Sequence, residues 1–341
     1  MAKFKRILIT GGAGFIGSNF VKYILGKYPD YHVIVLDALT YAGNLENLKS
    51  EMENPHFEFY HGDIRNREVV NNLMWNSEAI VHFAAETHVD RSILDADAFI
   101  TTDIYGTYVL LEAARAFGTK KFVHISTDEV YGEAVSRPSK EEDAFNPKSP
   151  YAASKAGADR LAYSYFATYG IPVVISRCCN NYGPYQYPEK LIPLFISNAL
   201  EDKPLPAYGT GKNTRQWIHV LDHCKAIDLL LHSQDKCHGG AYNISSEEEF
   251  SIIDIGNTIL ENLGKPKSLL TPVKDRHGHV LRHAMDPTKM RETFNWKTEI
   301  GFKAGIKETI NWYKENQDWW KKTKEKSRDY QEFYRKWYSE R

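Results

Sequence analysis

Tyr151 and Lys155 form a Tyr-x-x-x-Lys pair, one of two groups of side chains whose types and spacing suit acid–base chemistry. Four residues make about one helical turn, so the two side chains share one face of a helix. A phenol with its ordinary pKa of about 10 is a poor base at neutral pH, whereas a nearby ammonium group favours the phenolate. The pair therefore predicts a tyrosine base assisted by a lysine. The alternative is a Tyr–Lys pair on a helix surface.

The second group is the pair of adjacent carboxyls Asp128 and Glu129, in the segment STDEVYG at residues 126–132. Expulsion of a hydroxyl group together with a proton from the neighbouring carbon requires both an acid and a base. Two carboxyl groups held in different environments can divide these roles between them. Taken alone, the pair is more typical of a solvated loop, so its surroundings decide the interpretation.

Glycines between an apolar run and a helical pattern indicate a dinucleotide site. Residues 6–18 read RILITGGAGFIGS, in which Gly11, Gly14 and Gly17 end a predicted strand and open a predicted helix. Glycines at this spacing allow a tight turn, close approach of the backbone to a pyrophosphate, and close packing of helix on strand. The N-terminus of the helix then presents N–H groups to the phosphates. A bound nicotinamide cation would add to the effect of Lys155 on Tyr151.

Asp37 lies 20 residues after Gly17, at the end of the second predicted strand. A carboxylate at this place accepts hydrogen bonds from the ribose hydroxyls of an adenosine and repels a 2′-phosphate. No Lys or Arg lies between Asp37 and Asn47 to neutralise such a phosphate. The sequence therefore predicts NAD rather than NADP as the cofactor. Asp63 either meets the adenine edge or caps a helix.

Alternating strands and helices must position these groups. The alternation predicts βαβ units, hence a parallel sheet covered on both faces. We expect an α/β fold, namely a Rossmann-type doubly wound parallel sheet with a smaller C-terminal α/β substrate lobe. The predicted strands are residues 6–10, 32–36, 57–61, 79–83, 121–126 and 172–177, and the predicted helices include residues 14–28, 105–117 and 152–169.

The expected domain organisation has three parts. Residues 1–178 form a dinucleotide-binding domain, residues 179–313 a substrate lobe, and residues 314–341 an aromatic and basic helical tail. Segments near residues 216–244 are candidates for a return to the first domain. The aromatic face of the tail is expected to pack on its own protein or on a twin subunit.

The glycine loop, the Tyr-x-x-x-Lys pair and the long C-terminal lobe resemble the extended short-chain dehydrogenase/reductase superfamily. Within it, the segments STDEVYG, HFAAETHVDRS at residues 82–92, CCNNYGP at 178–184 and RQWIH at 215–219 are similar to the dTDP-glucose 4,6-dehydratases. The resemblance covers nearly the whole chain, to about residue 313. The Asp–Glu pair discriminates, because the 4-epimerases and decarboxylases of the superfamily do not carry it there.

This resemblance implies an NAD-dependent hydro-lyase that converts dTDP-glucose to dTDP-4-dehydro-6-deoxy-glucose in deoxysugar and rhamnose biosynthesis. It implies that Thr127 hydrogen-bonds the C4 oxygen and helps Tyr151, that Asp128 protonates the C6 hydroxyl, and that Glu129 removes the C5 proton. It also implies a homodimer that pairs through helices near residues 105–117 and 152–169. The alternatives are a UDP-glucose 4,6-dehydratase, a nucleotide-sugar 4-epimerase or decarboxylase, and a nucleotide sensor without catalysis.

The resemblance further implies two sets of binding residues. The cofactor set comprises Gly11, Gly14, Phe15, Ile16, Gly17, Asp37, Leu39, Thr40, Asp63, Ile64, Phe83, Ala84, Ala85, Thr102, Tyr151, Lys155 and Asn181. The substrate set comprises Thr87, Asp128, Glu129, Asn180, Lys190, Leu191, Pro206, Ala207, Tyr208, Arg215, Arg276 and His279. The guanidinium groups of Arg215 and Arg276 suit a diphosphate, with a structural ion pair as the alternative for either.

Composition argues against several other classes of protein. The 341 residues include 43 basic and 44 acidic ones, and a net charge of −1 argues against a protein that coats nucleic acid or an anionic membrane. No apolar run approaches the ~18 residues of a spanning helix. Neither the 13 histidines nor Cys178, Cys179, Cys224 and Cys237 have metal-ligand spacing, so no metal site is expected. Four cysteines make no disulfide scaffold in a chain of this length, which favours a cytoplasmic location.

Overall fold

The computed structural model describes residues 4–339, so residues 1–3 of the predicted first domain and residues 340–341 of the predicted tail lie outside the described residues. Its centre is a seven-stranded sheet in the order β10-β6-β5-β4-β1-β2-β3, in which all neighbouring strands are parallel. The predicted α/β fold with a doubly wound parallel sheet is confirmed. The strands of this sheet are β1 (Arg6–Thr10), β2 (His32–Asp37), β3 (Phe57–His61), β4 (Ala79–His82), β5 (Lys121–Thr127), β6 (Val173–Cys178) and β10 (Ala241–Ile244).

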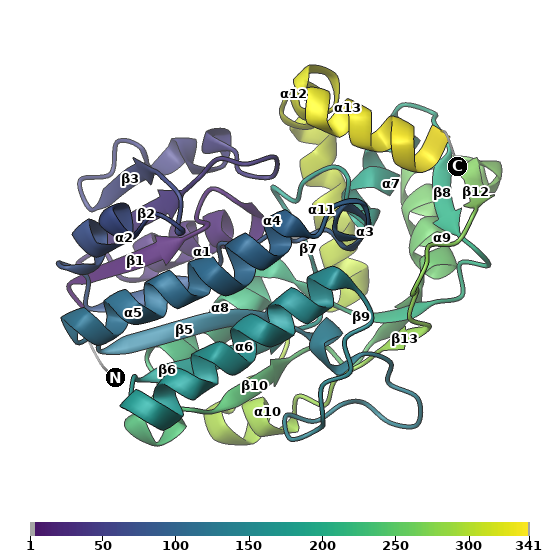
Figure 1. Cartoon of the computed structure of the whole chain (residues 1–341). Coiled ribbons are helices and arrows are strands. Elements are labelled where there is room, and N and C mark those ends of the chain that lie inside the picture. Colours follow the sequence, from purple (N-terminus) through teal and green to yellow (C-terminus); the bar gives the residue numbers. More distant parts are fainter. Residues whose placement is uncertain (1–3, 340–341) are drawn as a thin grey trace.

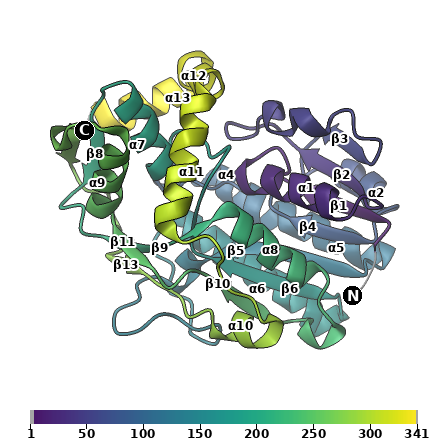
Figure 2. The same cartoon turned by 180° about the vertical axis from the view of Figure 1, so that it is seen from behind.

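Helices cover both faces of this sheet. Figure 1 shows α5 and α6 in front of it, and Figure 2 shows α1 and α8 on the opposite face. Alternate residues of a strand point to opposite faces. Leu8 and Ile80 accordingly belong to the core beneath α2, α5 and α6, whereas Ile9 and Val81 belong to the core beneath α1 and α8. These helices are α1 (Phe15–Lys27), α2 (Arg67–Met74), α5 (Thr107–Phe117), α6 (Pro150–Tyr169) and α8 (Val220–Leu231).

The chain enters the second lobe after β6 and then returns to the first sheet. β10 extends that sheet by pairing in parallel with β6, with Ala241 opposite Ile175. Helix α8, which precedes β10 in the chain, packs beside α1. Residues from the second half of the sequence therefore complete the sheet that carries the glycine loop.

The second lobe consists of small sheets and helices around a separate core. β9 pairs with β7, β11 and β13, and β8 pairs with β12. The core includes Phe195, Ile259, Ile306 and Trp320, all fully or almost fully buried. The elements are β7 (Asn180–Tyr182), α7 (Leu191–Leu200), β8 (Leu205–Tyr208), β9 (Thr214–His219), β11 (Glu249–Ser251), α9 (Ile252–Leu263), β12 (Leu270–Val273), β13 (Arg282–His283), α10 (Thr288–Phe294) and α11 (Phe302–Glu315).

Two short helices, α12 (Gln317–Lys326) and α13 (Arg328–Tyr334), follow α11, and a π-helical turn, η6 (Arg335–Ser339), follows them. Figure 1 shows them in yellow, beside α7 and β8. Trp320 of α12 is fully buried in the core of the second lobe. Within residues 4–339, no helix has both the length and the apolar character needed to cross a membrane.

The helix predicted at residues 105–117 begins later, at Thr107. The preceding segment, η2 (Ile100–Gly106), forms a wider π-helical turn. In this turn the Asp103 carboxylate accepts a hydrogen bond from Ser154 Oγ at 2.6 Å and another from the backbone N–H of Glu86 at 2.8 Å. The turn thereby places a buried carboxylate against α6.

Candidate active site

A cavity of about 460 Å³ lies at the carboxyl ends of the parallel strands and extends into the second lobe. The strand order reverses between β1 and β4, and this is where an open α/β sheet forms a ligand crevice. Most of the predicted cofactor and substrate residues line this cavity, including Gly11, Asp37, Tyr151, Arg215 and Arg276.

The glycine loop at one end of the cavity leaves room for a phosphate group. Gly11 has a φ of +69°, and a Cβ there would lie 2.5 Å from the backbone N of Ala84. A Cβ on Gly17 would lie 2.2 Å from the carbonyl oxygen of Gly11. Gly14 is the N-cap of α1 and brings no capping side chain, so the first N–H groups of α1 are open to an anion. These features fit the pyrophosphate of a dinucleotide.

Asp37 is fixed at the end of β2 by two backbone N–H groups. Its carboxylate accepts hydrogen bonds from Ala13 at 2.9 Å and from Leu39 at 2.8 Å. Burial raises the pKa of Asp37, and these two hydrogen bonds oppose the rise. Its place on the cavity wall fits an adenosine ribose and therefore NAD.

Asp63 lines the same end of the cavity and forms an ion pair with Arg65, at 2.6 Å. Asn66, not Asp63, caps α2 by accepting hydrogen bonds from the backbone of Glu68 and Val69. The helix-cap alternative for Asp63 is therefore wrong. Its proposed place beside the adenine stays a prediction.

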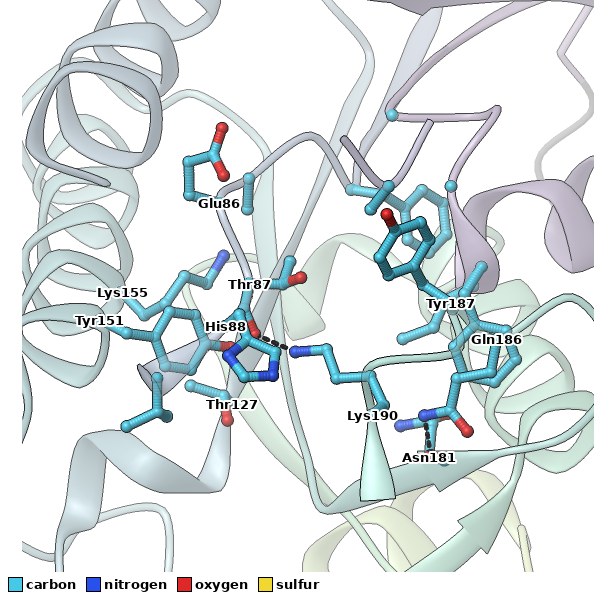
Figure 3. A pocket seen from close by; sticks show the side chains of 18 of the residues that line it. Glu86, Thr87, His88, Thr127, Tyr151, Lys155, Asn181, Gln186, Tyr187 and Lys190 are labelled. Carbon is cyan, nitrogen blue, oxygen red and sulfur yellow. Dashed lines mark hydrogen bonds between the residues drawn. The ribbon is translucent and has the colours of Figure 1, made fainter. Parts of the chain in front are cut away.

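Tyr151 and Lys155 lie on the first two turns of α6, which Ser149 caps and Pro150 begins. Lys155 Nζ donates a hydrogen bond to the carbonyl oxygen of Ile125 at 2.7 Å, which holds the ammonium group beside β5. Figure 3 shows Tyr151, Lys155 and Thr127 together on one side of the cavity. The Tyr–Lys pair thus faces the cavity and is not a surface pair.

The protein alone does not favour the phenolate form of Tyr151. Burial raises the pKa of Tyr151 well above its ordinary value, and the charges of Glu129 and Asp103 raise it further. A hydrogen bond with Thr127 opposes this rise, and burial lowers the pKa of Lys155 itself. The predicted lowering of the phenol pKa by Lys155 therefore requires additional positive charge, which the nicotinamide of NAD carries.

Asp128 and Glu129 follow β5 and occupy different environments. Thr127 Oγ1 donates a hydrogen bond to Asp128 Oδ1 at 3.1 Å, whereas Asp128 Oδ2 has no hydrogen-bond partner within the described residues. Burial, followed by the charge of Glu129, raises the pKa of Asp128 to about 7. Burial also raises the pKa of Glu129, but Arg276 and Arg215 oppose that rise. Asp128 therefore keeps a proton near neutral pH, and Glu129 faces cations that favour its carboxylate.

Cationic groups gather at the far end of the cavity. Arg215 donates hydrogen bonds to the carbonyl oxygens of Thr214 at 2.8 Å and Val280 at 2.9 Å. Arg276 forms an ion pair with Asp90 at 2.9 Å. Burial lowers the pKa of Lys190 to about 8. Arg276 therefore does form an ion pair within the protein, the alternative considered for either arginine. Both arginines nevertheless line the cavity and suit a diphosphate.

The predicted site residues fall into two groups by position. Those that line the cavity are Gly11, Gly14, Phe15, Ile16, Gly17, Asp37, Thr40, Asp63, Ile64, Phe83, Ala84, Ala85, Thr87, Thr102, Thr127, Glu129, Tyr151, Lys155, Asn180, Asn181, Lys190, Leu191, Pro206, Tyr208, Arg215, Arg276 and His279. Those that lie outside the lining are Leu39, Asp128 and Ala207. Asp128 is buried directly behind Thr127. Ala207 lies between two lining residues of β8, so its side chain points to the other face.

Several polar residues of the cavity wall were not predicted from the sequence. His88, Asp90, Tyr187 and Glu189 are among them, and the first two belong to the segment HFAAETHVDRS. That motif was a usable signal, but it could not indicate which side chains turn inward. Among the described residues, no group of three or more His, Cys, Asp or Glu side chains is arranged to hold a metal ion.

The parallel sheet, the phosphate-binding glycine loop and the Tyr–Lys pair at the strand ends define the class of this protein as the extended short-chain dehydrogenases/reductases. The family model described as GDP-mannose 4,6 dehydratase matches residues 8–309. The chain belongs to this family of nucleotide-sugar dehydratases, and within it to the dTDP-glucose 4,6-dehydratases. The resemblance stated from the motifs is confirmed.

Individual relatives match over almost their whole length. The chain is 46% identical over 323 residues to a dTDP-glucose 4,6-dehydratase of Streptomyces niveus, covering 94% of this chain and 96% of that protein. It is 47% identical over 307 residues to the low-salt glycan biosynthesis protein Agl12 of Haloferax volcanii, covering 90% and 98%. A crystal structure of dTDP-glucose 4,6-dehydratase from Streptomyces venezuelae with NAD and TDP bound has 47% identity and a TM-score of 0.90, covering 93% of this chain and 99% of that one.

Proposed function

We propose that this protein catalyses the NAD-dependent dehydration of dTDP-glucose to dTDP-4-dehydro-6-deoxy-glucose. The observation that carries the proposal is the pair Asp128–Glu129: Glu129 lines, with Tyr151, the cavity that also holds a dinucleotide loop, and Asp128 is buried directly behind Thr127 of the same wall. The names of the relatives support the same reaction and the same substrate. A 4-epimerase needs no acid for a leaving hydroxyl, so it would have no use for the protonated Asp128.

The side chains divide the proton transfers among them. Tyr151 takes the proton of the C4 hydroxyl, and Thr127 hydrogen-bonds the C4 oxygen. The resulting carbonyl acidifies the neighbouring C5–H, so that Glu129 removes this proton while Asp128 gives its own to the departing C6 hydroxyl. Glu129 then returns a proton to C5. When bound, NAD would supply the acceptor for the C4 hydride, and the hydride would return to C6.

The cationic end of the cavity would hold the nucleotide. Arg215 and Arg276 would bind the diphosphate, because guanidinium groups match phosphate oxygens in geometry and charge. Asn180, Lys190, Tyr208 and the other predicted substrate residues would surround the sugar and the base. UDP-glucose has the same diphosphate and hexose, so the substrate of a UDP-glucose 4,6-dehydratase differs from the proposed one only in the base and in the 2′-hydroxyl of the ribose.

Product analysis tests the proposal directly. The purified protein is incubated separately with dTDP-glucose, UDP-glucose and UDP-glucuronic acid, and the products are measured by mass spectrometry. We expect dTDP-glucose to lose one water molecule, with no net formation of NADH. An isomer of unchanged mass would identify an epimerase, and loss of carbon dioxide from a uronic acid substrate would identify a decarboxylase. No change in any substrate, despite nucleotide binding, would identify a sensor.

We further propose a three-part organisation: a cofactor domain at residues 1–178, joined by α8 and β10, a substrate lobe at residues 179–313, and a tail at residues 314–341. We also propose a cytoplasmic homodimer that works in deoxysugar and rhamnose biosynthesis. Exposed aromatic side chains on η2 and α6, such as Tyr105, Tyr163 and Tyr169, support pairing through this face. Analytical ultracentrifugation of the wild type and of Tyr163→Glu tests it, with a monomeric variant as the expected outcome.

A further inference from the structure

The C-terminal segment α13–η6 (residues 328–339) lies beyond the residues that the family model matches. One face of it carries Asp329, Tyr330, Phe333 and Trp337, which follow the spacing of helical turns. Tyr330, Phe333 and Trp337 are almost fully buried. Figure 1 shows the segment above α3 (Val89–Leu94) and close to β8, and both of these elements contribute residues to the cavity wall.

The segment contacts α3 through Arg91, a residue of that helix. The Arg91 guanidinium forms ion pairs with Glu189 at 2.7 Å and with Asp329 at 2.6 Å. It also lies over the ring of Phe333, at 4.7 Å from the ring centre. Glu189 is a buried residue of the cavity wall, and Arg91 is the partner that compensates its charge. Asp329 therefore completes a three-residue ion network that joins α3, the loop before α7 and the tail.

Two further contacts reach cavity-lining residues directly. Phe333 packs edge-on against the ring of His88, with 5.1 Å between ring centres. Trp337 Nε1 donates a hydrogen bond to the hydroxyl oxygen of Tyr208. The Tyr208 hydroxyl in turn donates to Asp90 Oδ2 at 2.7 Å.

Asp90 links this chain of contacts to the diphosphate end of the cavity. Its other carboxylate oxygen, Oδ1, accepts the ion pair from Arg276. Trp337, Tyr208, Asp90 and Arg276 thus form one continuous hydrogen-bonded series, and all but Trp337 line the cavity. Any displacement of Trp337 changes the orientation of Tyr208 and removes a constraint on Arg276.

We propose that the segment α13–η6 forms the outer support of the nucleotide-sugar site, with Asp329 and Trp337 as positioning residues for Arg91 and Tyr208. The proposal rests on the proposed function, because it assigns the cationic end of the cavity to a nucleoside diphosphate. The segment acts on the affinity for the nucleotide sugar and leaves the cofactor end unchanged. The glycine loop lies at the opposite end of the cavity.

The test compares three variants with wild type: Asp329→Asn, Trp337→Phe and a chain that ends after Ser327. Lys324→Met is the matched control, because Lys324 anchors α12 to Glu201 at 2.9 Å in the same tail without touching the cavity wall. Affinity for dTDP is measured by calorimetry on the NAD-loaded protein. NAD affinity, KM for dTDP-glucose and kcat are measured separately.

We expect dTDP affinity and KM to worsen about threefold in Asp329→Asn, because half of that side chain is exposed and the ion pair is screened. About threefold is also expected for Trp337→Phe, which loses one hydrogen bond but keeps an aromatic ring. The shortened chain should lose about tenfold or more, since both supports are absent. NAD affinity and kcat should stay within about twofold throughout, and Lys324→Met should lower Tm without a change in dTDP affinity.

Different results overturn different claims. Unchanged dTDP affinity in the shortened chain would overturn the supporting role of the segment while leaving the proposed function intact. An equal loss of NAD and dTDP affinity would also overturn it, since that pattern indicates general unfolding. Absence of dTDP binding by the wild type would overturn the proposed function itself, and this inference with it.

Discussion

The two ends of the cavity are built in different ways. At the cofactor end, one short stretch around Gly11, Gly14 and Gly17 supplies the phosphate cradle, and backbone N–H groups fix Asp37. At the nucleotide-sugar end, the working groups are charged side chains from α3, β9 and the loop before β13, and the tail supports them. In a site built from backbone, substitutions at a few positions have large effects on affinity. In a network of side chains, substitutions at many positions each have a smaller effect.

The largest effect is expected where the two ends meet. Glu129→Gln keeps the shape of the side chain but removes the base proposed to take the C5 proton. We expect kcat for dehydration to fall by about 10²–10⁴-fold, the usual contribution of a general base. Oxidation at C4 should persist, so absorbance of enzyme-bound NADH should accumulate after substrate is added. Near-wild-type dehydration by Glu129→Gln would show that the base lies elsewhere.

At the cofactor end, Gly11→Ala tests the backbone character of the site. The positive φ and the close approach to Ala84 make a Cβ costly, by about 1–3 kcal/mol. We expect NAD affinity to fall about tenfold or more, as measured by calorimetry, together with a lower Tm. Gly26→Ala, in the helix α1 that follows the loop of Gly11, is the control, because its Cβ meets nothing within 4 Å. That variant should bind NAD normally, and equal behaviour of the two variants would refute the cradle.

At the nucleotide-sugar end, Asp90→Asn tests the side-chain network. The amide can still accept a hydrogen bond from Tyr208, but it no longer balances the charge of Arg276. We expect KM for dTDP-glucose to rise about five- to tenfold, with NAD affinity unchanged. Asp30→Asn, at an exposed position far from the cavity, is the control. A fall in NAD affinity equal to the change in KM would erase the distinction between the two ends.

The smallest effect is a pH dependence near neutrality. Asp128, the proposed acid, would act in its protonated form, and its pKa is raised from the ordinary value of 3.8 to about 7. Because the acid form is lost as pH rises through the folded-state pKa, kcat should fall by about twofold at pH 7 and more steeply above it. Because the pKa of Asp128 is higher in the folded than in the unfolded chain, its proton also contributes to the free energy of unfolding, and this contribution is lost as pH rises toward 7. A pH profile of kcat checks this fall at rising pH. Asp128→Asn should abolish the pH dependence together with most of the activity.

The same contrast explains what the sequence could predict. Strands β1 to β6 were predicted to within one or two residues, because a sheet buried on both faces consists of near-continuous apolar runs. The glycine loop and Asp37 were found for a related reason, since a fixed spacing along the chain places them at the ends of the neighbouring strands β1 and β2. Asp90 and Trp337 could not be found in this way. They meet through Tyr208, and only tertiary folding brings their three segments together.

The different environments of Asp128 and Glu129 were likewise predicted only in part from the sequence. Their adjacency suggested two roles, but the direction of each pKa depends on surroundings far away in the chain. Arg215 and Arg276 come from the second lobe, and they oppose the effect of burial on Glu129. The dependence of Tyr151 on added positive charge also became evident only from its place in the cavity wall, where burial raises the pKa of the phenol.

The path of the chain through α8 and β10 limits how such a protein can be divided. Cutting after residue 178 would remove β10, one of the two neighbours of β6, and leave unpaired N–H and C=O groups along Ile175–Cys178 of that buried strand. A fragment of this kind invites intermolecular strand pairing and precipitation. Swapping sugar specificity between relatives as one contiguous segment would therefore disrupt the sheet that carries the glycine loop. Grafts confined to the loops around α3, β9 and the tail leave the seven-stranded sheet intact.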